Sequence, residues 1–489
     1  MNKGKALILV HNLHQPDTFF NIGAGYLVSV LKQYGAEVDV FDMAINDLNE
    51  DHLADYLQDN DDYSIIGLGF LSARFRETVE PLCKVINKYK NKALLVLGGN
   101  GASAIPRYTL EKTQADIICI GESEESIVEV LNYKINGGNF ANIKGIAYRK
   151  GNEIIINPRR NPVANLDSIP SPDYSAFDMS KYTTNIKLAG MTEKDKCFPI
   201  TTSRGCTNRC TFCYRMERGV RARSLKNIIQ EIKYLNNEFG VTYFFAFDEL
   251  FLYSKQRIFD FAKALKDNNL NIMYNCNARV SLFDSEIAKC LQDSGCQFIN
   301  FGFESTSQRV LDAMHKNVKV QQNFQAAEIC KKLDISMGVN ILWNMPFDDE
   351  QTLKDNTQFV LDYSDLSQVR TIRPVCCYPG SDLFWKSIAD GSLKDEDDFF
   401  NKFKNSDLIT VNYTKMPTEK CYELLYEANK TLITHHYLHT NNDMVTANKL
   451  IQDFKDLYSG KDIKFRGARS DATNEDKRKF LRQINEVRK

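Results

Sequence analysis

Three cysteines stand close together at Cys206, Cys210 and Cys213, and they follow the short apolar run at residues 198–200. Thiolates are soft ligands that suit iron–sulfur clusters and zinc, and most such sites in proteins use four protein ligands. No fourth Cys or His follows nearby at ligand spacing. The pattern favours a cubane cluster with one iron left open for a small molecule. A zinc site completed by a distant ligand is the alternative.

Phe212 precedes the third cysteine, and a C-x3-C-x2-C spacing with an aromatic at this position resembles the signature of the radical SAM superfamily. In that family the open iron chelates the amino and carboxylate groups of S-adenosylmethionine (SAM). One-electron reduction then cleaves SAM to a 5′-deoxyadenosyl radical. The resemblance implies that Cys206, Cys210 and Cys213 hold a catalytic 4Fe–4S cluster and that Phe212 contacts SAM.

Length and composition set the broad class of the protein. A chain of 489 residues predicts two or three domains. The net charge of −1 argues against a nucleic-acid partner, and no apolar window reaches the ~18 residues of a membrane span. Thirteen cysteines without a secretory signal predict reduced thiols in the cytoplasm. The locally basic tail from Phe454 is expected to be a solvated helix, and a contact surface for an acidic partner is the alternative.

The first 137 residues alternate short apolar runs with amphipathic helical patterns. The runs are at residues 6–10, 38–41, 64–69, 93–97 and 117–120. Continuous apolar strands separated by helices indicate a parallel sheet covered on both faces. Five such units predict a doubly wound, flavodoxin-like α/β domain over residues 1–137. Ligands in such folds bind at the carboxyl ends of the strands.

The loops at those strand ends carry glycine and polar residues, within the stretches FLSA, VLGGNGA and ICIGESEE. Placed ahead of the cysteine motif, this region resembles the cobalamin-binding domain of the cobalamin-dependent, class B methyltransferase-like radical SAM enzymes. The chain lacks the D-x-H-x-x-G motif that supplies a cobalt ligand in other cobalamin folds, and it has GGNG where the family often has GGPH. An empty, vestigial domain is the alternative. The resemblance implies that cobalamin is bound by Leu71, Ser72, Gly98, Gly99, Asn100, Gly121 and Glu122.

Strand and helix patterns alternate again after a turn-rich linker. Residues 138–196 are expected to form that linker, with a hairpin around Gly151. Residues 197–390 carry six strand–helix units, which match the partial (β/α)6 barrel of radical SAM enzymes, and such a barrel places its site at the carboxyl ends of its strands. Residues 391–489 are predicted to be a helical C-terminal domain.

The predicted barrel strands end in residues that can bind SAM. Asp248 and Glu249 follow the second strand, where the family receives the SAM amino group. After the third strand, the Asn277 amide suits a ribose and the Arg279 guanidinium suits a carboxylate, and the resemblance assigns both residues to SAM. Glu304, in a G-x-E-S sequence after the fourth strand, is a SAM acceptor by resemblance or else a structural carboxylate.

The resemblance implies a C-methyltransferase that acts on an unactivated carbon of a small molecule or peptide through a deoxyadenosyl radical and methylcobalamin. An electron donor such as a flavodoxin or ferredoxin is the expected partner. Three alternatives stay open: a cyclase or rearrangement enzyme that uses cobalamin without methyl transfer, a radical SAM enzyme with an empty N-terminal domain, and a cobalamin- or SAM-responsive binding protein.

Overall fold

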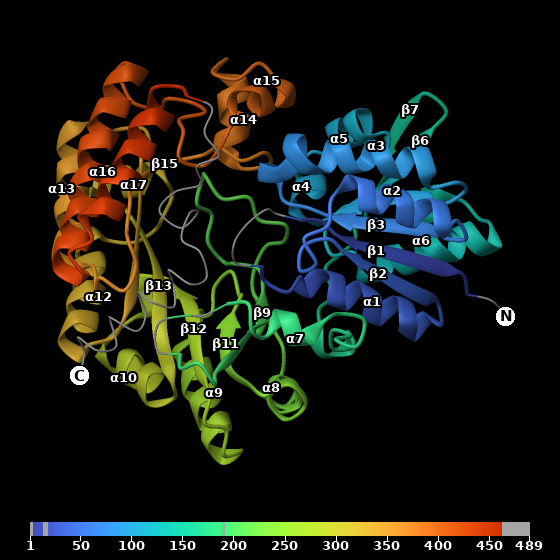
Figure 1. Cartoon of the computed structure of the whole chain (residues 1–489), viewed down its shortest axis with the longest axis horizontal. Coiled ribbons are helices and arrows are strands. Elements are labelled where there is room, and N and C mark those ends of the chain that lie inside the picture. The colour runs from blue at the N-terminus through green and yellow to red at the C-terminus, as the bar shows by residue number, and fades with distance from the viewer. Residues whose placement is uncertain (1–2, 13–17, 187, 189–190, 462–489) are drawn as a thin grey trace. The chain divides into compact units, whose positions relative to one another are not determined.

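The computed structural model describes residues 3–12, 18–186, 188 and 191–461 (Figure 1). The predicted basic tail lies largely outside the described residues. The chain divides into two compact units. The first unit comprises Met1–Thr183, Tyr214–Ser224 and Tyr378–Trp385, and the second comprises Thr184–Cys213, Leu225–Cys377 and Lys386–Lys489.

The first unit is built on a seven-stranded sheet with the order β2-β1-β3-β4-β5-β6-β7. The first five strands of this order pair in parallel, and β6 and β7 form an antiparallel hairpin at the edge beside β5. The parallel order 2-1-3-4-5 is the flavodoxin-like order, so the predicted doubly wound domain is confirmed. The strands are β1 Lys5–Val10, β2 Glu37–Asp42, β3 Ile65–Gly69, β4 Leu94–Gly98, β5 Ile117–Cys119, β6 Ile146–Lys150 and β7 Glu153–Ile156.

Helices cover both faces of this sheet (Figure 1). On one face α1 packs against α6, and on the other α2 packs against α3 and α3 against α5. The α-helices are α1 Ile22–Tyr34, α2 Glu50–Asp59, α3 Glu80–Tyr89, α4 Gly99–Ala104, α5 Pro106–Thr113, α6 Glu124–Asn136 and α7 Met179–Tyr182. Shorter elements are the 3-10 turns Ser72–Arg74, Phe140–Asn142 and Leu166–Ser168, the π turn Phe75–Val79, and β10 Arg221–Ala222.

The second unit is built on a six-stranded parallel sheet with the order β15-β14-β13-β12-β11-β8. The strands are β8 Lys196–Ile200, β11 Val241–Ala246, β12 Met273–Ala278, β13 Cys296–Glu304, β14 Met337–Trp343 and β15 Arg373–Pro374, and β9 Ser203–Arg204 follows β8. This sheet is the predicted partial barrel, and the prediction of six strands is confirmed.

Helices line the outer side of the barrel sheet (Figure 1). They are α8 Leu225–Phe239, α9 Lys255–Asp267, α10 Ser285–Asp293, α11 Gln308–Ala313, α12 Val320–Leu333 and α13 Glu350–Tyr363, with 3-10 turn Val280–Leu282 after β12. Later helices are α14 Asp382–Ala389, α15 Glu396–Lys402, α16 Thr418–Thr440 and α17 Met444–Tyr458. Helix α16 packs on α13 and α17, which confirms the helical C-terminal region.

Strand β13 shows how the barrel sheet divides its two faces. Ile299, Phe301 and Phe303 are fully buried, and the Phe303 ring packs edge-on against Phe359 of α13. Asn300 and Gly302 alternate with them and are only half-buried. Because successive side chains of a strand point to opposite faces, the apolar set faces the helices and the polar set faces the inside of the barrel.

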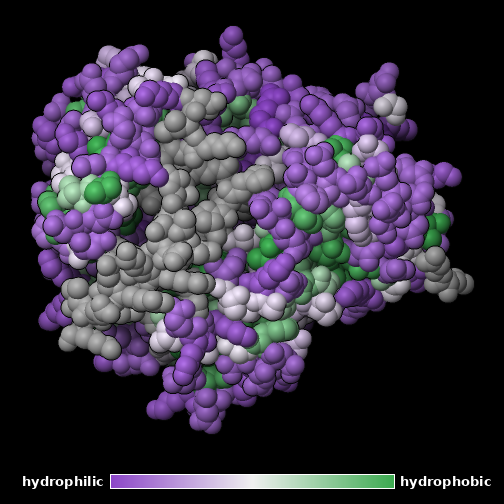
Figure 2. Space-filling view, in the orientation of Figure 1, coloured by the Kyte–Doolittle hydropathy of each residue, from purple (hydrophilic) through white to green (hydrophobic). Residues whose placement is uncertain are grey.

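The surface is mostly polar, because most of the large apolar side chains are buried. On the face drawn in Figure 2, hydrophilic residues dominate, and hydrophobic residues form small patches between them. Among the helices in the described part of the chain, none combines the length and the apolar character needed to cross a bilayer.

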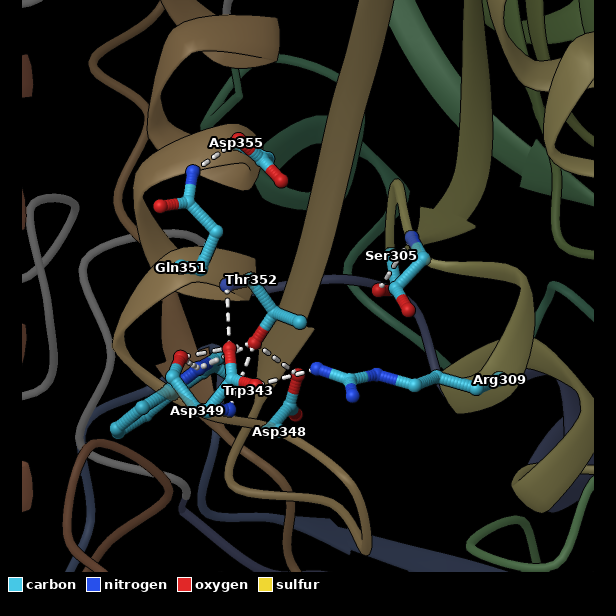
Figure 3. A network of polar contacts seen from close by, with 9 residues as sticks. Ser305, Arg309, Trp343, Asp348, Asp349, Gln351, Thr352 and Asp355 are labelled. Carbon is cyan, nitrogen blue, oxygen red and sulfur yellow. Dashed lines mark hydrogen bonds and ion pairs between the residues drawn. The ribbon is translucent and has the colours of Figure 1, made fainter.

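A polar network closes the turn between β14 and α13 (Figure 3). Asp349 caps α13 by accepting from the Thr352 N–H at 2.8 Å, and it pairs with Arg309. Asp348 accepts from the Met345 N–H and from the Thr352 hydroxyl, both at 2.9 Å. Burial raises the pKa of Asp348 to about 7, although these two hydrogen bonds and Arg309 oppose the shift.

Asp348 gives the fold a pH dependence of known sign. Its pKa rises from an ordinary value of 3.8 to about 7 on folding, so the folded chain binds the proton more tightly than the unfolded chain. The free energy of unfolding should fall as the pH rises through that window, by up to about 1.4 kcal/mol per pH unit. D348N should remove this slope in urea-unfolding midpoints measured between about pH 5 and about pH 8. The exposed-site control D267N should keep it, and an unchanged slope in D348N would contradict the assignment.

Candidate active site

The three cysteines of the predicted cluster lie on the loop that follows β8 and β9 in the second unit. Gly205 turns the chain into this loop with a φ of +86°, which glycine adopts without strain. Cys210 is buried, Cys206 is half-buried and Cys213 is exposed. The Cys213 N–H donates to the Cys210 carbonyl at 3.2 Å, so these two cysteines share one turn.

The loop carries three thiols that could bind a metal, but their sulfurs are not yet arranged around one metal position. Across residues 3–12, 18–186, 188 and 191–461, no three Cys, His, Asp or Glu side chains converge closely enough to hold a metal ion as they stand. Two side-chain N–H donors nevertheless point at the sulfurs. Asn208 Nδ2 lies 3.5 Å from Cys206 Sγ, and Arg279 Nη1 lies 3.4 Å from Cys210 Sγ. Such donors stabilise thiolates, the form that binds iron, so these residues fit the predicted cluster.

The Asp248 carboxylate fixes the start of the cysteine loop. It is buried just beyond the end of β11, and it accepts from the Thr202 N–H at 2.6 Å, the Thr202 hydroxyl at 2.5 Å and the Ser203 hydroxyl at 2.6 Å. Burial raises the pKa of Asp248, and the hydrogen bonds from Ser203 and Thr202 oppose that shift. Asp248 thus anchors the start of the cysteine loop through the hydrogen bonds that it accepts from Thr202 and Ser203. The contact of Asp248 with the SAM amino group stays a prediction.

The other residues predicted to bind SAM differ in exposure. Glu249 is exposed and Phe212 is half-buried. Arg279 and Glu304 are each only 8% exposed. The Arg279 Nη2 donates to the Lys316 carbonyl, and its Nε is a buried donor without a partner in the described part of the chain. That unused donor fits a carboxylate such as that of SAM.

Glu304 is held by a buried cation. Lys316 Nζ lies 2.7 Å from Glu304 Oε1, and their side chains are 6% and 11% exposed. Gly302 makes room for this pair, because a Cβ at that position would lie 2.4 Å from Glu304 Oε1 and 3.0 Å from Lys316 Nζ. The pair gives Glu304 a structural partner. The two interpretations of this residue, a SAM acceptor and a structural carboxylate, both stay predictions.

Three asparagines form a continuous row of amides on the inner face of the barrel. Asn340 donates to the Asn300 oxygen at 2.8 Å, and Asn300 donates to the Asn277 oxygen at 3.0 Å. Asn277 in turn donates to the Asp248 carbonyl at 3.2 Å. A Cβ on Gly338 would lie 2.2 Å from the Asn300 oxygen, so glycine at this position is needed for the row. The row therefore links three strands to the anchor of the cysteine loop.

The sequence singled out Asn277, as a predicted SAM contact, but did not point to Asn300, Asn340 or Lys316. The alternation of asparagines with apolar residues in β12, β13 and β14 was an available signal for the row, since every second residue of a strand shares a face. Nothing local marked Lys316, because its partner Glu304 belongs to a different element.

In the first unit the predicted cobalamin residues gather at one edge of the sheet. Leu71 and Ser72 follow β3, and Leu71 is 57% exposed. Gly98 ends β4, while Gly99 and Asn100 open α4. Gly121 and Glu122 follow β5. Because β3, β4 and β5 are parallel neighbours, these residues share the carboxyl edge where doubly wound sheets bind ligands.

The glycines of this edge have packing roles as well. A Cβ on Gly99, whose φ is +83°, would lie 2.9 Å from the Phe70 carbonyl oxygen, and one on Gly101 would lie 2.4 Å from the Phe70 ring. Gly69 has open space around the position of a Cβ. Close contact between the ends of β3 and β4 thus accounts for Gly99 and Gly101, whereas the space at Gly69 is compatible with a bound ligand.

Glu122 lies in a bidentate ion pair with Arg221. The two oxygen–nitrogen contacts are 2.5 and 2.9 Å, and the side chains are 10% and 16% exposed. Arg221 also donates to the Val163 carbonyl at 2.6 Å, and the Val163 N–H donates to Glu122 at 3.3 Å. These contacts fill much of the hydrogen-bonding capacity of Glu122; its predicted contact with cobalamin stays a prediction.

Comparison with family models agrees with this two-part geometry. Residues 13–131 match the B12 binding domain, and residues 200–360 match the radical SAM superfamily. An uncharacterized methyltransferase of Pyrococcus horikoshii is 26% identical over 405 residues, which cover 81% of each chain. The anaerobic magnesium-protoporphyrin IX monomethyl ester cyclase of Cereibacter sphaeroides is 27% identical over 322 residues, covering 62% of this chain and 50% of the cyclase.

A solved structure shares the fold. The cobalamin-dependent SAM radical enzyme OxsB, with aqua-cobalamin and SAM bound, matches with a TM-score of 0.68 at 18% identity, covering 99% of this chain and 79% of OxsB. The chain thus carries the domain pair of the cobalamin-dependent radical SAM proteins. A radical SAM domain uses a 4Fe–4S cluster and SAM, and a B12 binding domain uses cobalamin, so these are the cofactors of this chain.

The role of Glu122 can be tested through its ion pair. If the pair is structural, E122Q and R221M should each destabilise the chain by about 3 kcal/mol, because each leaves a buried charge without its partner. The double variant E122M/R221M should recover most of that loss in urea unfolding and should bind hydroxocobalamin like the unmodified chain. Weaker cobalamin binding by E122Q at unchanged stability would instead identify Glu122 as a cobalamin contact.

Proposed function

We propose that the chain is a cobalamin-dependent radical SAM C-methyltransferase that acts on an unactivated carbon of a small molecule or peptide. The observation that carries the proposal is a three-cysteine loop whose sulfurs accept from Asn208 and Arg279, in a chain that also has a B12 binding domain. The Pyrococcus relative, similar over most of both chains, is named as a methyltransferase and supports the same class.

The chain's own residues have separable tasks in this proposal. When bound, the cluster supplies the electron that cleaves SAM, and cobalamin carries a methyl group. Cys206, Cys210 and Cys213 provide the thiolates. Asp248 holds the start of their loop, and the amide row from Asn277 presents fixed polar groups on the inner face of the barrel. Fixed dipoles of this kind stabilise charge that develops during a reaction.

A cyclase or rearrangement enzyme that uses cobalamin without methyl transfer is the second candidate. The similarity to the magnesium-protoporphyrin ester cyclase favours it, although the chain spans about half the length of that enzyme. The two candidates share the cofactors and differ in their products.

The proposed setting is the cytoplasm, with a flavodoxin or ferredoxin as electron donor. All thirteen cysteines are free thiols in the structure, which suits a reducing compartment. The near-zero net charge supports a partner other than nucleic acid.

Loss of the three thiols should remove the cluster and leave the fold. The variant C206A/C210A/C213A should bind no iron and make no deoxyadenosine from SAM, while its circular dichroism spectrum matches that of the unmodified chain. C290A, which removes a half-buried thiol from α10, is the matched control and should keep both properties. Deoxyadenosine from the triple variant would refute the assignment of the cluster.

Anaerobic reconstitution with iron, sulfide and hydroxocobalamin should give about four irons and about one cobalt per chain by metal analysis. With substrate and a reductant, a methylated product together with S-adenosylhomocysteine is expected for the methyltransferase. Deoxyadenosine with an unmethylated product would favour the cyclase. Iron without cobalt would exclude methyl transfer through cobalamin.

A further inference from the structure

Arg279 is aimed at a predicted cluster ligand. It follows the carboxyl end of β12, is 8% exposed, and places Nη1 3.4 Å from Cys210 Sγ. A guanidinium keeps its positive charge at every accessible pH. A buried cation beside a thiolate interacts strongly because little solvent screens it.

A short segment after α11 holds the guanidinium in place. Its Lys316 carbonyl accepts from Arg279 Nη2, and its Met314 carbonyl accepts at 2.9 Å from the N–H of Thr211, next to Cys210. His315 has a φ of +52°, a left-handed conformation that L residues adopt only when their surroundings enforce it. One short segment therefore contacts both the cysteine loop and the arginine that points at it.

The charge of Lys316 does not add to that of Arg279. Its ammonium is paired at 2.7 Å with the Glu304 carboxylate, in a site where both residues are buried. A neutral donor acts on the neighbouring ligand, since Asn208 Nδ2 lies 3.5 Å from Cys206 Sγ. Arg279 and Asn208 thus provide a charged and a neutral N–H···S contact to two different sulfurs.

We propose that Arg279 and Asn208 set the reduction potential of the cluster by donating to the sulfurs of Cys210 and Cys206, and that Arg279 is the stronger of the two. Reduction adds negative charge, so a nearby cation stabilises the reduced state more than the oxidised state. Hydrogen bonds to cluster sulfurs act in the same direction. The proposal goes beyond SAM binding, which is the role that the sequence suggested for Arg279. It rests on the cluster assigned to these cysteines and is independent of methyl transfer.

The experiment is a redox titration of the reconstituted chain, followed by the electron paramagnetic resonance signal of the reduced cluster without SAM. R279Q should lower the equilibrium constant for reduction about tenfold, which is a shift of about 59 mV to more negative potential for one electron. R279K keeps the positive charge, so its potential should lie much closer to that of the unmodified chain than the potential of R279Q does. K263Q removes a cation from an exposed pair on α9 and should match the unmodified chain.

N208A should shift the potential in the same direction as R279Q but less. If R279Q does not retain iron, the comparison of N208A and R279K with K263Q carries the test. The proposal would be overturned if R279Q had the same reduction potential as K263Q. If R279Q has no cluster, the same potential in N208A as in K263Q would overturn it. A loss of SAM affinity in R279Q without a change in potential would make Arg279 a SAM ligand instead. Iron missing from the unmodified chain would contradict the proposed function itself, whereas a shifted potential without methylated product would leave this inference standing.

Discussion

The structure of the barrel depends on one buried carboxylate. Asp248 leaves β11 just beyond the point where Ala246 is in register with Ile200 of β8. Its three donors belong to Thr202 and Ser203, the residues that lead into the cysteine loop. A buried carboxylate is costly unless its oxygens are hydrogen-bonded, so a shift of this strand end would carry a penalty of several kcal/mol. The starting point of the loop is fixed by that penalty.

The same anchor continues across the sheet. The Asp248 carbonyl accepts from Asn277, and the amide row extends through Asn300 to Asn340. Each amide in the row uses its neighbour as a partner, which offsets the cost of partly burying polar groups. Asn340 also donates to the Phe301 carbonyl, so the row is tied to the backbone at both ends. A polar inner wall built in this way is rigid before any ligand binds.

The elements of the fold could be predicted from the sequence because they follow from local patterns. Continuous apolar runs such as residues 93–97 predicted the parallel strands, and the spacing of Cys206, Cys210 and Cys213 marked the loop that is predicted to hold the cluster. Contacts that depend on register could not be predicted. The partners Glu122 and Arg221 are 99 residues apart, and only the folded chain brings them together. Asn300 became part of a row because strand pairing sets it beside Asn277.

The charges around the cysteine loop also follow from the folded chain alone. Arg279 was identified by its type and its place after a strand, and both facts suit a SAM carboxylate equally well. The contact with Cys210 is set by the left-handed turn at His315, which presents the Lys316 carbonyl to the guanidinium. Lys316 turns its own charge to Glu304, so this ion pair is close to neutral overall. The positive charge of Arg279 therefore stays beside the Cys210 sulfur. On the proposed cluster it would stabilise the negative charge that reduction adds.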